Sequence, residues 1–344
     1  MVADSNEVGP VKCLEFFAGI GGFHHALQEA GVKAVIRALD INNVTNTIYK
    51  YNFPHTEIQQ CNIEKLKSDY YDDYNADLWL MSPPCQPFTR KGLKKDMKDY
   101  RCNALKNICI ALKTMKCIPR YIILENVCGF ETSEIHDMLK NTLLDLSYYI
   151  EEYILSPTEI GIPNSRPRYY LLANLSTRNA FNKSFIRIAN TWPIVNTRTF
   201  CKKFIGQYLC SEADEDDTLL ILLETIQRFI RVIHFVTPSS SYSCCFTKSY
   251  YHYFAGTGSV LFRVGKQIQD EEMSMEQLRK MALGDKFMDS QIRYLSWREV
   301  ANLLGFPATF MKPPEISVKQ MYRSLGNSIT VSGVSLLIQH LLKL

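Results

Sequence analysis

Short apolar runs alternate with helical patterns along the first half of the chain. The expected strands are residues 11–17, 34–40, 76–82, 121–127, 148–155 and 169–175. Segments with helical spacing of apolar positions lie between most of them, the first ending near residue 30. This alternation is typical of a parallel sheet with crossover helices, so we predict an α/β fold with a doubly wound, mostly parallel sheet.

The alternation decays after about residue 180. The acidic run 212–217 indicates an exposed loop or an insertion, 218–236 an amphipathic helix, and 239–262 irregular or β structure. Helical patterns resume at Trp297 and over 329–342. We therefore expect a main domain formed by residues 1–181 and 293–344, with a smaller inserted domain at 182–292.

Composition places the chain among ordinary globular proteins. Of 344 residues, 46% are hydrophobic and 22% are charged, which excludes a mostly disordered chain, a collagen and a coiled coil. No apolar run reaches the ~18 residues that a membrane span needs. The polar N-terminus does not resemble a secretory signal. We expect a soluble protein of the cytoplasm, the nucleus or both, without a membrane partner.

The cysteines and the charged residues further narrow the classes of protein to which this chain could belong. The eleven cysteines show no zinc-type spacing, so we expect neither a metal nor a disulfide framework. The net charge of +4 is too small to indicate a nucleic-acid partner by itself. Between residues 86 and 120, however, ten Lys or Arg face only two Asp. Such a run is most often a solvated face. Here it is also a candidate phosphate-binding surface, because it directly follows Cys85, the candidate nucleophile described below.

A glycine turn follows the first expected strand. Gly19, Gly21 and Gly22 are present, but His24 occupies the third glycine slot of the dinucleotide fingerprint, which disfavours NAD and FAD. Asp40 ends the second expected strand, where an acid binds ribose hydroxyls in such sheets. The pattern favours an adenosine-containing ligand, although glycine turns are also simply structural.

Cys85 stands in a proline-rich segment, residues 82–88 (SPPCQPF), directly after an apolar strand. Prolines stiffen the segment, and the nearby Arg90 and Lys91 would stabilise a thiolate, so Cys85 is the candidate nucleophile. Glu125 ends another strand at the same sheet edge, although a surface acid would also fit there. Arg166 and Arg168 begin a later strand and are uninformative alone.

These motifs occur in one order: the glycine turn, Pro-Pro-Cys-Gln, Glu-Asn-Val, Arg-Pro-Arg and a C-terminal Gly-Asn-Ser. Together they resemble the cytosine-5 methyltransferase family, which uses S-adenosylmethionine. Residues 82–90 (SPPCQPFTR), 245–248 (CFTK) and 322–328 (YRSLGNS) are similar to the tRNA aspartate cytosine-5 methyltransferase group, historically called the second eukaryotic DNA methyltransferase. The resemblance implies a class I, Rossmann-like methyltransferase fold with an inserted target-recognition domain.

The resemblance also implies roles for individual residues. Catalytic roles are implied for Cys85, Glu125, Arg166 and Arg168. A cofactor site is implied for Phe17, Ile20, Gly21, Gly22, Asp40, Ile63, Glu64, Ser82, Asn327 and Ser328. Contacts to nucleic acid are implied for Arg90, Lys91, Lys94, Lys95, Cys245, Thr247 and Lys248. We have no mechanism for Cys245 and expect a structural cysteine.

The implied chemistry begins with addition of the Cys85 thiolate to carbon 6 of cytosine, which puts electron density on carbon 5. Glu125 would hydrogen-bond ring nitrogen 3 and the amino group, and Arg168 would hold the 2-oxygen. The expected substrate is an anticodon-loop cytosine of tRNA-Asp, with DNA as a weak partner, and the expected protein is a monomer.

Three rival interpretations remain. DNA cytosine-5 methylation uses the same chemistry and cannot be separated by it. A catalytically inactive nucleic-acid binder is disfavoured by the intact Cys85, Glu125 and arginines. A nicotinamide oxidoreductase is disfavoured by the failed glycine fingerprint.

Overall fold

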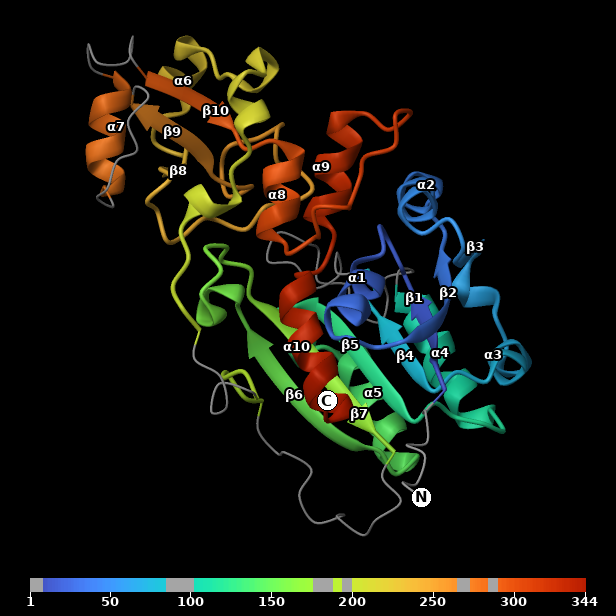
Figure 1. The fold of residues 1–344 in the computed structure, drawn as a ribbon. Helices are drawn as coiled ribbons and strands as arrows, with labels where there is room; N and C mark the ends of the chain where they lie inside the picture. Colours follow the sequence, from blue (N-terminus) through green and yellow to red (C-terminus); the bar gives the residue numbers. More distant parts are fainter. Residues whose placement is uncertain (1–8, 85–101, 176–187, 194–199, 265–272, 284–289) are drawn as a thin grey trace, which may run out of the picture. The chain divides into compact units, whose positions relative to one another are not determined.

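A computed structural model describes residues 9–84, 102–175, 188–193, 200–264, 273–283 and 290–344. The chain forms two compact units (Figure 1). The first unit comprises Met1–Ile154, Arg168–Asn190 and Val334–Leu344, and the second comprises Leu155–Pro167 and Thr191–Gly333. The second unit differs from the inserted domain expected at 182–292, because its main segment begins at Thr191 and it also includes residues 155–167 and 293–333. The boundaries of the target-recognition domain stay a prediction.

The first unit is built on a seven-stranded sheet with the order β3-β2-β1-β4-β5-β7-β6 (Figure 1). The strands are β1 (Val11–Phe16), β2 (Ala34–Asp40), β3 (Glu57–Gln60), β4 (Leu78–Met81), β5 (Tyr121–Val127), β6 (Tyr149–Leu155) and β7 (Arg168–Asn174). Strand β1 pairs in parallel with β2 and β4, and the β2–β3 and β4–β5 pairs are also parallel. Strand β7 runs antiparallel to β5. The predicted mostly parallel, doubly wound sheet is confirmed.

Within the described residues, five helices connect the first six of these strands: α1 (Gly22–Glu29), α2 (Asn43–Asn52), α3 (Ser68–Tyr74), α4 (Asn103–Thr114) and α5 (Glu134–Asp145). Most of the C-terminal helix α10 (Val331–Leu342) also belongs to this unit. Side chains start two of the helices, since Asn42 accepts the backbone N–H of Val44 and Ser133 accepts that of His136. Helix α4 buries Leu105, Ile108, Cys109 and Leu112 at helical spacing, so one face joins the core under the sheet.

Strand register determines which residues meet at the carboxyl edge of the sheet. Phe16 is paired with Leu39 and with Met81, and Met81 is paired with Leu124. The next residue on each strand therefore falls in a single row: Phe17, Asp40, Ser82 and Glu125. Ligands of open α/β sheets bind at this edge.

The second unit contains a three-stranded sheet with the order β10-β9-β8. Its elements are α6 (Leu223–Phe229), β8 (Phe235–Val236), β9 (Val260–Val264), α7 (Met275–Leu283), β10 (Ser290–Tyr294), α8 (Trp297–Leu303) and α9 (Val318–Gly326). The prediction of one helix over 218–236 is wrong. Helix α6 covers seven residues, and the apolar end of that segment is strand β8, which pairs with β9.

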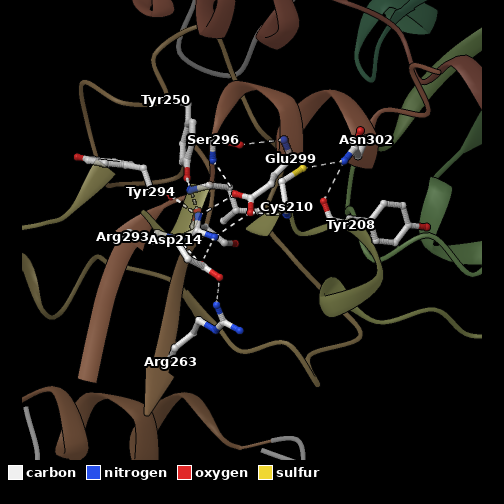
Figure 2. Close-up of polar contacts among 12 residues, drawn as sticks. Tyr208, Cys210, Asp214, Tyr250, Arg263, Arg293, Tyr294, Ser296, Glu299 and Asn302 are labelled. Carbon is white, nitrogen blue, oxygen red and sulfur yellow. Dashed lines mark hydrogen bonds and ion pairs between the residues drawn. The ribbon is translucent and has the colours of Figure 1, made fainter. Parts of the chain in front are cut away.

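An ion-pair network stabilises the second unit (Figure 2). Arg293 and Glu299 are fully buried and form two hydrogen bonds of 2.8 Å with each other. Arg293 also lies 2.9 Å from Asp214, which pairs with Arg263 as well. Glu299 accepts the backbone N–H of Ser296 and so closes a capping box at α8. The acidic run, predicted to be an exposed loop, thus includes one carboxylate with a structural role.

The C-terminal segment Val318–Leu342 is long and apolar enough to cross a membrane by length and composition alone. The structure divides it into α9 and α10, and 56% of its most apolar stretch is buried. These features are typical of core helices in a folded protein, so the segment is weak evidence for a membrane span.

Candidate active site

The glycine turn joins β1 to α1 in the first unit. Phe17, Gly19 and Gly21 all have positive φ, at 55°, 57° and 84°. At Gly21 a side chain is also excluded by space, because a Cβ there would lie 2.9 Å from the ring of Phe53. Ile20 is buried, so the turn presents its backbone rather than the Ile20 side chain.

Asp40 holds this turn to the end of β2. Its Oδ2 accepts the backbone N–H of Gly19 (2.9 Å), and its Oδ1 accepts that of Asn42 (2.8 Å). Burial raises the pKa of the Asp40 carboxyl, and these N–H groups partly offset that effect. A carboxylate has about four acceptor sites, and the backbone N–H of Ile41 also acts on Asp40, so about one site remains for a hydroxyl of a ribose. The remaining acceptor capacity of Asp40 therefore fits the ribose in the adenosine part of S-adenosylmethionine.

Ser82 and the segment Ile63–Lys65 border the same strand ends. Ser82 Oγ donates to the carbonyl of Phe17 (3.2 Å), which joins the end of β4 to the glycine turn. Ile63 and Glu64 lie in a short 3-10 helix that Asn107 of α4 anchors through the carbonyls of Ile63 and Leu66. Ile63 is buried in the main core, whereas Glu64 is exposed.

One candidate for the adenine-binding surface was missed from the sequence. Ile41 directly follows Asp40, and 64% of its surface is exposed. An exposed apolar side chain beside Asp40, the predicted ribose-binding carboxylate, would offer an apolar contact for an aromatic base. The available signal was an apolar residue immediately after the strand-ending acid.

Glu125 and Arg168 form an ion pair on the first unit's sheet. Register pairs Val127 with Arg168 and Glu125 with Tyr170, so Glu125 and Arg168 are diagonal neighbours on one face. Arg168 Nε lies 3.2 Å from Glu125 Oε1, and the two side chains are 13% and 10% exposed. Their shielding from water would strengthen electrostatic interactions with a group bound beside them.

Arg166 lies in the second unit and binds protein groups there. It is 2% exposed, and its guanidinium donates to Cys245 Sγ (3.4 Å) and to the carbonyls of Phe246 (2.9 Å), Gly326 (3.2 Å) and Ser328. These contacts join the segment around Cys245 to the end of α9. They give Arg166 a structural role beside the catalytic role that the resemblance implies.

The Cys245–Lys248 segment packs closely against the end of α9. A Cβ on Gly326 would lie 2.1 Å from the carbonyl carbon of Thr247, so only glycine permits this approach. Cys245 and Thr247 are partly buried and Lys248 is exposed. Asn327 is the C-cap of α9, and the backbone N–H of Ser328 donates to the carbonyl of Leu325 (3.0 Å).

Five predicted site residues lie outside the described residues: Cys85, Arg90, Lys91, Lys94 and Lys95. The segment before Cys85 is described, and Asn126 Nδ2 on β5 donates to the carbonyl of Pro83 (3.4 Å). Within the described ranges, no group of three or more His, Cys, Asp or Glu side chains could hold a metal ion.

Known proteins resemble this chain over nearly its whole length. A tRNA (cytosine(38)-C(5))-methyltransferase from Homo sapiens is 36% identical, with 96% of this chain and 98% of that protein covered. A DNA (cytosine-5)-methyltransferase from Dictyostelium discoideum is 32% identical, with coverage of 96% and 93%. The crystal structure of the S. pombe Dnmt2 methyltransferase superimposes with a TM-score of 0.80 at 35% identity, covering 97% of this chain and 99% of that one.

The family described as C-5 cytosine-specific DNA methylase matches residues 11–343. The match spans both units and includes every residue placed above at the carboxyl edge of the sheet. It confirms the resemblance inferred from the order of the motifs. The chain belongs to the C-5 cytosine-specific DNA methylase family.

Proposed function

We propose that this protein transfers a methyl group from S-adenosylmethionine to carbon 5 of a cytosine in tRNA. The proposed target is cytosine 38, the position named in the human relative, in the anticodon loop of tRNA-Asp. The observation that carries the proposal is the Glu125–Arg168 pair at the end of β5, in register with the glycine turn, Asp40 and Ser82. This row brings a carboxyl and a guanidinium to the edge where a cofactor would bind.

Each residue of the row has a proposed task. Phe17, Gly21, Gly22, Asp40 and Ser82 bind and orient the cofactor, with Asp40 accepting from a ribose hydroxyl. When bound, S-adenosylmethionine supplies an electrophilic methyl group on a sulfonium sulfur. Asn327 and Ser328 are proposed to complete the cofactor site, as the resemblance implies.

Cys85 is the proposed nucleophile. Its thiolate adds to carbon 6 of the cytosine, so that carbon 5 becomes electron-rich enough to accept the methyl group. Glu125 hydrogen-bonds nitrogen 3 and the amino group of the ring, and Arg168 holds the 2-oxygen, where negative charge develops. Loss of the carbon 5 proton then releases Cys85.

The proposed RNA surface combines the basic residues after Cys85 with the Cys245–Lys248 segment. An anticodon-loop cytosine costs less to extrude than a paired one, because loop bases are already partly unstacked. Arg166 supports this surface by holding Phe246 next to the end of α9. We further propose that the protein acts as a monomer in the cytoplasm, the nucleus or both.

DNA methylation is the second candidate, because a relative that is 32% identical is named a DNA (cytosine-5)-methyltransferase. Methyl incorporation from labelled S-adenosylmethionine into total tRNA and into duplex DNA separates the two candidates. We expect the label in tRNA, and bisulfite sequencing should place it at the named cytosine of tRNA-Asp. Incorporation into DNA alone would contradict the proposal.

The covalent step is tested with tRNA that carries 5-fluorocytosine at the target. Fluorine cannot be removed as a proton, so the methylated adduct cannot resolve and should survive denaturation in detergent. We expect the adduct with the wild type and with Cys245→Ala, and not with Cys85→Ala. An adduct formed by Cys85→Ala would overturn the assignment of the nucleophile.

A further inference from the structure

A buried acid, Glu15, lies inside the first unit, two residues before Phe17 of the candidate cofactor site. Glu15 is in β1 and is fully buried, and its neighbours in register are Ala38 on β2 and Leu80 on β4. Acidic side chains are rarely buried unless they have partners. The proposed catalytic steps do not use Glu15, so its partners need an explanation.

Tyr49 of α2 is the side-chain partner of Glu15. The Tyr49 hydroxyl is buried and donates to Glu15 Oε2 (2.7 Å). The same hydroxyl oxygen lies 3.0 Å from His24 Nδ1. A tyrosine has one hydroxyl hydrogen, so His24 must donate its Nδ1–H to Tyr49 when Tyr49 donates to Glu15. Burial lowers the pKa of His24 to about 3, so the ring is neutral, and in this arrangement of hydrogen bonds its one N–H is on Nδ1.

The chain of contacts continues to the glycine turn. The His24 ring stacks on Phe53 with centroids 3.5 Å apart and an interplanar angle of 8°. If Gly21 carried a Cβ, that atom would lie 2.9 Å from the ring of Phe53 and 3.3 Å from Tyr49 Cδ2. The ring positions of Phe53 and Tyr49 therefore determine where Gly21 can lie.

The other side of Glu15 faces the start of α1. Glu15 Oε1 is buried and has no hydrogen-bond partner among the described residues, while the nearby backbone N–H groups of Phe23 and His24 lower the pKa of the carboxyl group. These are N–H groups of the first helical turn, which have no partner inside the helix and favour a negative group. Glu15 thus acts on the glycine turn twice, through the start of α1 and through Tyr49.

We propose that Glu15, Tyr49 and His24 form a positioning network for the glycine turn, with Tyr49 as its central link, and that this network sets the affinity for S-adenosylmethionine. The inference rests on the proposed function, in which the turn binds that cofactor. Tyr49 is a positioning residue, since it acts through Phe53, His24 and Glu15.

The network also predicts a pH dependence of binding. Burial raises the pKa of Glu15 to about 8, and the hydrogen bond from Tyr49 limits that rise. The titratable groups that face the network are Cys13, His24, His25, Asp40, Tyr49 and Tyr74. Burial raises the pKa values of Cys13, Tyr49 and Tyr74 and lowers that of His25 to about 4, so these groups keep one charge state around pH 8.

Ionisation of Glu15 places a negative charge beneath the turn. A sulfonium cation is attracted to that charge, so S-adenosylmethionine should bind more tightly above about pH 8 than below it. S-adenosylhomocysteine has a neutral sulfur and should respond less. Tyr49→Phe removes the hydrogen bond that lowers the Glu15 pKa, so the inflection should move to higher pH.

Isothermal titration calorimetry of both ligands from about pH 6.5 to 9.5 tests these expectations. Tyr49→Phe should weaken binding of both ligands by about 3- to 10-fold, the effect of one hydrogen bond. Both ligands carry an α-amino group that also titrates in this range, so Glu15→Gln should remove the difference between the pH responses of the two ligands. Tyr51→Phe is the matched control on the same helix, because Tyr51 is 50% exposed, and it should behave as the wild type does.

The experiment distinguishes failure of the positioning network from failure of the proposed function. Tyr49→Phe with wild-type affinity and an unmoved inflection overturns the proposal, and so does a wild type in which both ligands respond alike to pH. Should circular dichroism show that Tyr49→Phe does not fold, Glu15→Gln decides, because a persisting difference between the two ligands then overturns it. A wild type that binds neither ligand instead contradicts the proposed function.

Discussion

Single side chains in this protein often serve both the fold and the candidate site. Asp40 receives backbone N–H groups from the glycine turn and from the segment after β2, and it is also the proposed ribose acceptor. Arg166 is similar, because its contacts to three carbonyls hold segments that are far apart in the chain. A substitution at such a residue removes more than one interaction, so its control must be chosen with care.

Asp40→Ala should raise the dissociation constant for S-adenosylhomocysteine. The lost charge-assisted hydrogen bonds correspond to about 1.5–3 kcal/mol, or roughly 10- to 150-fold. Calorimetry measures the effect, with Asp69→Ala, an exposed acid on α3, as the control. Normal affinity in Asp40→Ala would refute the ribose assignment.

Cys245→Ala should reduce turnover by about 3- to 30-fold and leave measurable activity. The substitution removes the sulfur that accepts from Arg166, while Arg166 keeps its carbonyl partners. Steady-state methylation of tRNA provides the measurement. Complete loss of turnover in a folded variant that still binds tRNA would show that Cys245 has a chemical role.

The residues that the sequence could predict are those whose role follows from local position. Asp40 ends β2 and Glu125 lies two residues before the end of β5, and parallel pairing brings these positions to one edge of the sheet. Arg166 is different, because its partners are about 80 and 160 residues away along the chain. Glu15 is another such case, since a single acid within an apolar strand does not reveal that Tyr49 lies opposite it.

At the scale of elements, apolar strands were predictable and polar or short ones were not. The predicted ranges 34–40 and 121–127 match β2 and β5. Strand β3 (EIQQ) has one apolar residue and was missed, because edge strands need little burial. The 218–236 segment was predicted as one helix because its apolar positions suit a helix, yet tertiary pairing makes its end a strand.

A buried polar cluster joins α5 to β6 and β7. Glu152 accepts from His136 Nε2 (2.6 Å), Lys140 Nζ (2.5 Å) and the Tyr169 hydroxyl (2.8 Å). Burial would raise the pKa of Glu152, but these hydrogen bonds outweigh it and lower the pKa to about 2. Burial lowers the pKa of His136, and its bonds to Glu152 and Asp137 raise it more, so the net shift is upward.

Glu152→Gln should lower the free energy of unfolding by about 1–3 kcal/mol near neutral pH. Because the folded pKa of Glu152 is below its ordinary value of 4.5, its stabilisation is present above pH 4.5 and is lost as the pH falls towards 2. The gap between wild type and variant should therefore narrow in acid. The stabilisation from His136 has the opposite pH dependence. It is fully present below pH 6.5, the ordinary pKa of histidine, and is lost as the pH rises through the raised pKa of His136.

Urea denaturation across the acid and neutral range measures both effects. Asp145→Asn is the control, because Asp145 pairs with Lys113 at the surface, and it should change stability by at most about 0.5 kcal/mol. A wild-type pH profile in Glu152→Gln would contradict the assignment.

At the scale of the whole molecule, the net charge is small, but the basic residues are concentrated in one segment of the chain. The net charge is +4, while ten basic residues lie between positions 86 and 120. Binding of tRNA through such a segment should depend steeply on salt, because each neutralised phosphate releases counterions.

Lys94→Ala combined with Lys95→Ala should weaken binding to any tRNA and reduce the slope of log affinity against log salt by about 1–2. The affinity for S-adenosylhomocysteine should not change. Lys33→Ala is the control, since Lys33 is exposed and precedes β2 at the opposite edge of the sheet from Asp40. An unchanged slope in the double variant would reject the phosphate-binding role.

The return of the chain to the first unit has a consequence for protein synthesis. Residues Val334–Leu344 belong to the first unit, and His340 Nε2 lies 2.7 Å from Glu151 Oε2 on β6. A ribosome releases the whole seven-stranded sheet long before it releases this last helical piece. During synthesis of residues 191–333, the first unit therefore lacks its C-terminal helical segment. A premature stop codon within Thr191–Gly333 leaves every strand of the first unit translated but deprives that unit of most or all of α10, so we expect such truncated chains to be cleared by proteolysis.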